Sequence, residues 1–129
     1  MIIALHSATP DTELYLLDGN NLVDQKLWRA DRQLARDLLK EIEELLRHAN
    51  KSWDDIDGLV VFKGPGSFTG LRIGCMVLNT IAYANTIPVV GSAGDDWLQK
   101  GAAMIAAGED HKSVLPDYGA EPRITTPRK

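Results

Sequence analysis

The chain has 129 residues and a formal net charge of −4, with 44% hydrophobic and 25% charged residues. This length is typical of one domain, and the composition is typical of a soluble globular protein that can bury a core. Two full-sized lobes with a cleft between them are excluded by the length. The acidic balance also argues against a domain that binds nucleic acid through its own surface charge, so any RNA role would need a partner.

Cys75 is the single cysteine, which excludes an internal disulfide and any site built from several cysteines. A reducing compartment is therefore expected. The first ten residues, MIIALHSATP, lack the basic start of a signal peptide and are typical of a strand. No apolar run approaches the roughly 18 residues that a membrane span needs. We expect a cytoplasmic protein that does not bind a membrane.

The first half of the chain predicts a hairpin followed by a helix. Apolar runs at residues 2–5 and 14–17 predict strands, and the turn residues at 18–21 join the second run to a third at 22–28. Between Asp31, a predicted N-cap, and Ala49 the apolar residues recur at helical spacing and the charged residues fill the other side. This pattern indicates a helix that lies on a sheet.

The second half predicts alternating strands and helices. Residues 59–62 are a short apolar run typical of a strand covered on both faces, and 88–90 predict another strand. Helices are expected from the glycine-rich turn to about Asn85, and again over 95–107. The order βββαβαβα predicts an α/β fold, a mixed sheet with helices on its faces, over residues 1–107. Residues 108–129 lack periodicity and are expected to be a tail that partly covers the domain or stays free.

The second helix is predicted to be apolar on two opposite sides. One side carries Leu71, Cys75, Leu78 and Ala82, and the other carries Ile73, Val77, Ile81 and Ala84. A sheet can cover one side, so the other is predicted to be a protein interface, which Gly70 and Gly74 would let another backbone approach. The alternative is that the C-terminal segment or a third helix covers this side within the chain.

The turn GPGSFTG at 64–70 places backbone N–H groups beside a helix N-terminus, an arrangement that suits a phosphate. It departs from two known phosphate motifs. Leu71 stands where the P-loop requires lysine, and Thr69 stands where the dinucleotide-binding motif requires glycine. A tight turn capped by Ser67 or Thr69 is therefore the main interpretation, and a phosphate- or nucleotide-binding enzyme is the alternative.

No constellation of residues predicts catalysis or a metal site. A two-metal nuclease needs carboxylates at the strand ends, but the first strand ends at His6 and the fourth at Lys63. The aspartates are predicted to be solvated or to cap helices, and the three histidines are too dispersed for a metal site. Ser67 has no evident base, and Cys75 is predicted to be inert packing.

The run GPGSFTGLRIG at 64–74, the preceding DDIDGLVV and the later IPVVGS resemble the bacterial tRNA threonylcarbamoyladenosine biosynthesis family TsaB (YeaZ). The similarity covers about residues 1–100. It implies an actin-like ATPase, or RNase H-like, lobe. It also implies a scaffold without catalysis of its own, which forms a heterodimer with TsaD. TsaD transfers threonylcarbamoyl to adenosine beside the tRNA anticodon, and the ATPase TsaE joins the pair. Self-association into a homodimer is the alternative when the partner is absent.

The resemblance also implies where the site lies. The family dimer uses the first two helices, which correspond to residues 31–49 and 68–85. Expected interface residues are Leu34, Leu38, Leu45, Gly70, Ile73, Gly74, Val77 and Ile81. The signature residues of the glycine loop are Gly64, Pro65, Gly66, Ser67, Phe68, Thr69, Gly70, Leu71, Arg72 and Gly74. No intrinsic cofactor is expected, and any ATP or ADP would sit at an interface shared with the complex.

The sequence departs from the family at three places. One is the start of the first helix, where Asp31-Arg32-Gln33-Leu34 stands in place of the histidine-serine pair that members often carry. His6 stands where members usually carry an aspartate at the end of the first strand, which argues further against nucleotide hydrolysis. After Gly108 a tail follows in place of the family's second lobe, and its VLPDYGAEPRIT resembles the closing segment of longer members.

Overall fold

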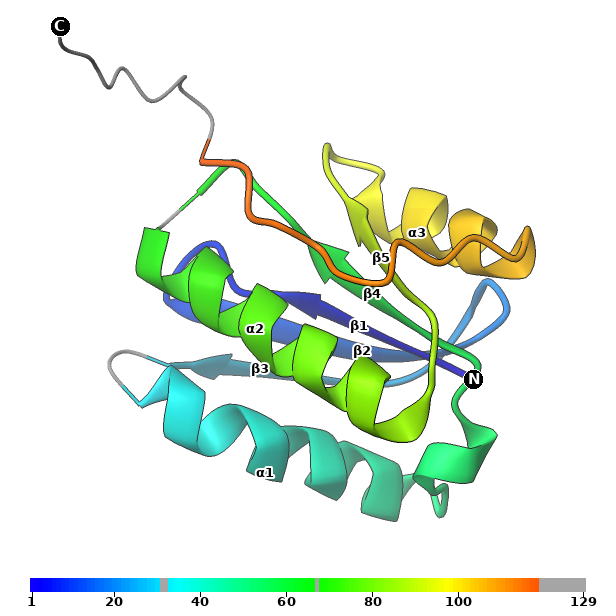
Figure 1. The fold of residues 1–129 in the computed structure, drawn as a ribbon. Coiled ribbons are helices and arrows are strands. Elements are labelled where there is room, and N and C mark those ends of the chain that lie inside the picture. The colour runs from blue at the N-terminus through cyan, green and yellow to red at the C-terminus, as the bar shows by residue number, and fades with distance from the viewer. Residues whose placement is uncertain (31–32, 67, 119–129) are drawn as a thin grey trace, which may run out of the picture.

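A computed structural model describes residues 1–30, 33–66 and 68–118 of the chain (Figure 1). It contains a five-stranded sheet, three α-helices and one short 3₁₀ helix in the expected order βββαβαβα. In chain order the elements are β1 (Ile2–His6), β2 (Asp11–Asp18), β3 (Asn21–Arg29), α1 (Leu34–His48), η1 (Trp53–Asp55), β4 (Gly58–Phe62), α2 (Phe68–Asn85), β5 (Val89–Ser92) and α3 (Trp97–Ala106).

The sheet is mixed, and its strands lie in the order β3-β2-β1-β4-β5. The hairpins make β2 antiparallel to β1 and to β3, while β4 runs parallel to β1 and β5 runs parallel to β4. Ile3 in the central strand pairs with Leu16 on one side and Leu59 on the other. All five residues of β4 are buried because helices cover both faces of the sheet there, as the uninterrupted apolar run predicts.

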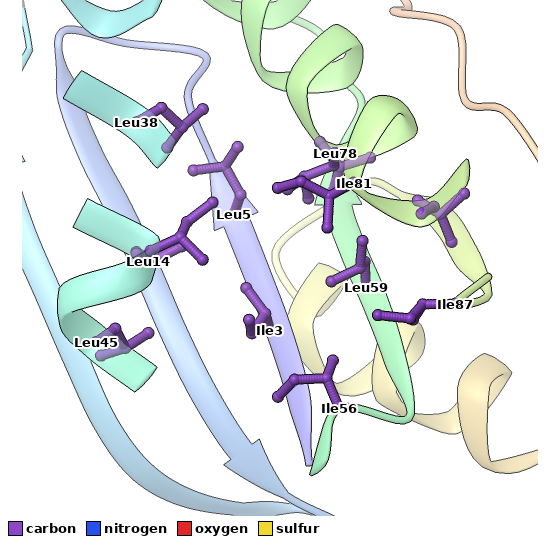
Figure 2. Packing of buried hydrophobic residues seen from close by; sticks show 14 of the residues in the cluster. Ile3, Leu5, Leu14, Leu38, Leu45, Ile56, Leu59, Leu78, Ile81 and Ile87 are labelled. Carbon is purple, nitrogen blue, oxygen red and sulfur yellow. The ribbon is translucent and has the colours of Figure 1, made fainter. Parts of the chain in front are cut away.

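Figure 1 shows α1 and α2 side by side on one face of the sheet and α3 on the other. Side chains of β1 alternate between the two cores, since successive residues of a strand point to opposite faces. Ile3 and Leu5 join the core under α1 and α2, whereas Ile2 and Ala4 join the core under α3. In Figure 2, Leu38 and Leu45 of α1 and Leu78 of α2 converge on β1 and β4 in the first of these cores.

The helix ends differ slightly from the sequence prediction. The predicted N-cap of α1, Asp31, lies outside the described residues, and the helix begins at Leu34. The acidic turn before β4 contains η1, which has a capping box in which the backbone N–H of Ser52 donates a hydrogen bond to the Asp55 carboxylate over 2.9 Å. The predicted capping role of this aspartate is therefore confirmed. No helix among the described residues is long and apolar enough to cross a membrane.

Residues 109–118 run along the outer edge of β5 and then beside α2, as the orange segment of Figure 1 shows. The backbone N–H of His111 donates to the carbonyl of Val89 over 2.8 Å, and the N–H of Gly91 donates to Nδ1 of His111 over 3.0 Å. Val114 is buried against the first core. The N–H of Asp117 then donates to the carbonyl of Lys63. The described part of the expected tail is thus a packed edge segment.

Candidate functional site

The glycine loop between β4 and α2 is tightly packed against two other parts of the chain. Gly64 has a φ of +127°, a conformation that side chains rarely adopt, and a Cβ there would overlap the carbonyl oxygen of Asp117. A Cβ at Gly66 would overlap Ala8, just after β1. These glycines therefore allow close packing within the chain. Ser67 and the side chain of Phe68, also part of the signature, lie outside what the structure describes.

Gly70 and Gly74 in the first turns of α2 lie against the end of β1. The hydroxyl of Ser7 donates a hydrogen bond of 2.8 Å to the carbonyl oxygen of Gly70, and a Cβ at Gly74 would overlap the Ser7 Oγ. The structure corrects the expectation that Gly74 opens a path for a second chain. The backbone approach that it permits is between α2 and β1 of this same chain.

The two apolar sides of α2 are covered to different degrees. Leu71, Cys75, Leu78 and Ala82 are buried as predicted. On the other side Ile81 is only 7% exposed, while Ile73 and Val77 are half-buried and pack against the first core. Neighbouring α1 covers much of this side, and the C-terminal segment covers a further flank through Asn79. The alternative of coverage within the chain thus accounts for part of this apolar surface.

The expected interface residues of α1 lie in the core. Leu34, Leu38 and Leu45 are at most 4% exposed and belong to the first core, where Figure 2 shows Leu38 and Leu45. A side chain with no accessible surface cannot contribute contact area to a partner, so these three are corrected to core residues. On one flank of α1, Glu41 and Glu44 form ion pairs with Lys26 of β3 at 2.6 Å and 2.8 Å, as expected when the leucines face the sheet.

The accessible part of α2 is a row of side chains of which the sequence analysis named only Arg72, as a signature residue of the glycine loop. Arg72, Met76, Thr80 and Tyr83 recur three or four residues apart and are all exposed. We call this row the outer stripe of α2. Met76 is 56% and Tyr83 is 90% exposed, large values for apolar and aromatic side chains. The seven-residue spacing of Met76 and Tyr83 was a sequence signal that could have located it.

The outer stripe continues toward α1. Ile73 and Val77, both expected interface residues, lie half-buried along its flank, and Leu39 of α1 is 45% exposed. An accessible apolar surface on two adjacent helices is the kind of surface that proteins use to bind one another. Of the expected interface residues on α2, Ile73 and Val77 are therefore the ones whose side chains remain accessible, close to Gly70.

Burial shifts the pKa values of two side chains near these elements. Burial raises the pKa of the Cys75 thiol to about 11, so this cysteine is protonated and unreactive at neutral pH. Burial also lowers the pKa of His6, against a smaller opposing effect of the Glu13 carboxylate. The His6 ring stacks on Phe62 with ring centroids 3.9 Å apart. Among the described residues, no group of three or more His, Cys, Asp or Glu side chains could hold a metal ion.

A mixed sheet in the order β3-β2-β1-β4-β5, with two helices on one face and a third on the other, defines an α/β lobe of the actin-like ATPase class. Comparison with solved structures supports this class. YeaZ from Pseudomonas aeruginosa superposes with a TM-score of 0.66 and 28% sequence identity, over 71% of this chain and 43% of that chain. A second structure, described as an uncharacterized protein with similarity to peptidase YEAZ from Pseudomonas aeruginosa, gives the same TM-score and identity. The expected likeness to TsaB (YeaZ) is confirmed.

Sequence comparison places the chain in a named family. The family described as "TsaD: tRNA N6-adenosine threonylcarbamoyltransferase" matches residues 28–106, more than half of the chain, and the chain belongs to this family. Proteins named tRNA N6-adenosine threonylcarbamoyltransferase from Listeria monocytogenes and Bacillus anthracis are each 39% identical over 62 residues. That match covers 48% of this chain and 18% of theirs, so the chain corresponds to a small part of these relatives.

Proposed function

We propose that this chain is a non-catalytic scaffold that supports formation of N6-threonylcarbamoyladenosine in tRNA by binding a TsaD-type threonylcarbamoyltransferase. Family membership and the likeness to YeaZ support the pathway. The exposed outer stripe of α2 carries the proposal of a scaffold, because Met76 and Tyr83 present apolar surface that the described residues leave uncovered. The partner surface comprises the outer stripe with Ile73, Val77 and Leu39 beside it.

The absence of a catalytic role is supported by the positions of the acidic side chains. Asp55 caps η1, Asp57 forms a 2.7 Å ion pair with the N-terminal ammonium group, and Asp96 lies 3.4 Å from Lys100. Each of these carboxylates has a structural contact at a separate place in the fold. The family's usual aspartate position is occupied by His6, whose ring is stacked on Phe62.

The proposed complex implies further partners for this chain. The transferase contacts this chain directly, the ATPase TsaE joins the pair, and tRNA is contacted only through the complex. ATP or ADP, where present, sits at an interface shared by the subunits. We place the assembly in the cytoplasm. When the transferase is absent, the same α1 and α2 surface would form a homodimer.

The test is binding to the transferase from the same organism, measured by calorimetry and size-exclusion chromatography. Met76→Glu and Tyr83→Glu each put a charge into the outer stripe, and we expect the dissociation constant to rise at least about tenfold, as for truncation of a central interface residue. Leu27→Glu is the matched control, because Leu27 is 62% exposed and lies on β3, away from α2. Absence of a complex with the wild-type chain, or equal weakening by Leu27→Glu, would contradict the proposal.

Homodimerisation is measured in the same series. Sedimentation of the isolated chain at increasing concentration should show a dimer that Met76→Glu dissociates. A dimer that survives this substitution would mean that self-association uses a different surface, and the transferase would then be the sole proposed occupant of the outer stripe.

One observation favours the second candidate, a phosphate- or nucleotide-binding enzyme that uses the Gly64–Gly70 loop. A cavity of about 100 Å³ lies beside the first turn of α2, and it is lined in part by Ser7, Thr9, Thr12 and Thr69. The Thr12 Oγ1 is buried and has no hydrogen-bond partner among the described residues. Hydroxyl groups at a helix N-terminus suit an anion. Calorimetry with ATP and ADP tests this function, and turnover of either nucleotide would favour it over the scaffold.

A further inference from the structure

A second pocket lies on the other face of the sheet, at the carboxyl ends of β1 and β4. Its volume is about 380 Å³, and it is lined by His6, Glu13, Phe62, Pro65, Gly94, Asp95 and Trp97. Ligands of open α/β sheets bind outside the carboxyl ends of the strands, which is where this pocket lies. Nothing in the proposed scaffold function uses it, since the outer stripe of α2 belongs to the opposite face.

One wall of the pocket is aromatic. The His6 and Phe62 rings are stacked, with centroids 3.9 Å apart and an interplanar angle of 17°. Trp97 meets both rings nearly edge-on, with its centroid 5.6 Å from that of His6 and 5.8 Å from that of Phe62. The cluster gives this side of the pocket an apolar surface, next to which electrostatic attraction is stronger than in open water. Burial lowers the pKa of His6, so the imidazole is neutral at pH 7 and adds no positive charge.

Two carboxylates at the pocket lack a cationic partner. Glu13 accepts a 2.6 Å hydrogen bond from the Tyr15 hydroxyl, and neither Glu13 nor Asp95 forms an ion pair with a lysine or arginine within the described part of the chain. Two acidic residues close to them in the sequence do have cationic partners. Asp11 pairs with Arg29 at 3.3 Å, and Asp96 pairs with Lys100 at 3.4 Å. Glu13 and Asp95 therefore bring to the pocket two carboxylates with no ion pair to a described lysine or arginine, and Lys100, whose Nζ lies near Gly94, is paired with Asp96.

We propose that this pocket binds the guanidinium group of an arginine side chain presented by a partner polypeptide. A guanidinium is planar and weakly hydrated, stacks on aromatic rings and makes paired hydrogen bonds to a carboxylate. Glu13 and Asp95 supply the carboxylates, and the partly exposed His6 ring, backed by Phe62 and Trp97 at 8% exposure each, supplies the aromatic wall. This binding is independent of the α2 interface, so either site could fail its test while the other passes.

The probe is N-acetyl-arginine amide, titrated into the full ¹⁵N-labelled chain and followed by NMR. We expect the indole N–H resonance of Trp97, assigned with Trp97→Phe, to shift and saturate. N-acetyl-citrulline amide has nearly the same shape without the charge, and it should give little or no shift. An equal response to the citrulline probe, or no response to the arginine probe, would overturn the proposal.

Substitution of the carboxylates locates the binding. Glu13→Gln keeps an acceptor for the Tyr15 hydroxyl and, like Asp95→Asn, removes one charge, so each should weaken arginine binding at least about threefold. Asp18→Asn is the control, because Asp18 is exposed at the opposite end of β2 and its substitution changes the net charge by the same amount. If Asp18→Asn weakens binding as much as Glu13→Gln, the attraction is a property of the whole acidic surface and the assigned pocket is wrong.

Discussion

The side-chain amide of Asn79 in α2 forms two hydrogen bonds with the backbone of Val114. The N–H of Val114 donates to Oδ1 over 2.9 Å, and Nδ2 donates to the carbonyl of Val114 over 3.0 Å. This pair attaches the C-terminal segment to a helix 35 positions earlier in the chain. An amide is suited to this role because it offers a donor and an acceptor side by side.

Asn79→Ala removes both hydrogen bonds and leaves two partly buried backbone groups without their partner. We expect a loss of about 1–3 kcal/mol in the free energy of unfolding, measured in urea. Amide hydrogen exchange should become faster at His111 and Val114. Thr80→Ala is the control, because among the described residues the Thr80 hydroxyl bonds within its own helix, to the carbonyl of Met76. Equal effects of the two substitutions would mean that Asn79 does not hold the segment in place.

Gly74→Ala places a methyl group against the Ser7 hydroxyl. Replacing glycine by alanine inside a helix normally stabilises the folded state by about 0.5–1 kcal/mol. Here the overlap with Ser7 should instead destabilise the fold by about 1–3 kcal/mol. In a Ser7→Ala background the overlapping oxygen is gone, so the same Gly74→Ala change should cost less or stabilise. Urea unfolding of the four proteins measures the coupling. Additive effects of the two substitutions would show that the residues are not in contact.

Leu38 and Leu39 are adjacent on α1 and test which side of the helix supports the fold. Leu38 is fully buried and Leu39 is 45% exposed. Leu38→Ala should lower the free energy of unfolding by about 2–5 kcal/mol, and Leu39→Ala should change it by about 0.5 kcal/mol or less. In the binding assay with the transferase we expect Leu39→Ala to weaken the complex. Similar losses of stability at both positions would contradict the observed orientation of α1.

Burial of His6 predicts that stability depends on pH. Because burial depresses its pKa in the folded state below the ordinary value of 6.5, the unfolded chain binds the proton more readily. The contribution is therefore present above pH 6.5 and is lost as the pH falls below 6.5 toward the depressed value. Urea unfolding between about pH 7.5 and 5.5 should show falling stability in the wild type. His6→Gln should flatten this dependence, and an unchanged slope would show that other groups cause it.

Much of the fold could be predicted from local patterns. The helical spacing around Leu38 and the apolar run of β4 predicted their elements because the period of a helix or strand is written in a short window of sequence. The run at 64–74 predicted the class of the fold through its resemblance to a known family, which the likeness to YeaZ confirmed. The surface was predicted less well. Leu38 was expected at an interface and lies in the core, whereas the exposed Tyr83 was not singled out.

The sequence by itself determined the order of the elements, the inner side of α2 and the presence of a glycine-rich turn, since each depends on residues close together in the chain. Only the tertiary structure decided that α1 covers part of the second side of α2 and that Gly74 faces Ser7. It also decided that Glu13 and Asp95 line the same pocket. The physical reason is that a helix pattern shows which positions share a side. Which side becomes buried depends on the elements that pack against it from distant parts of the chain.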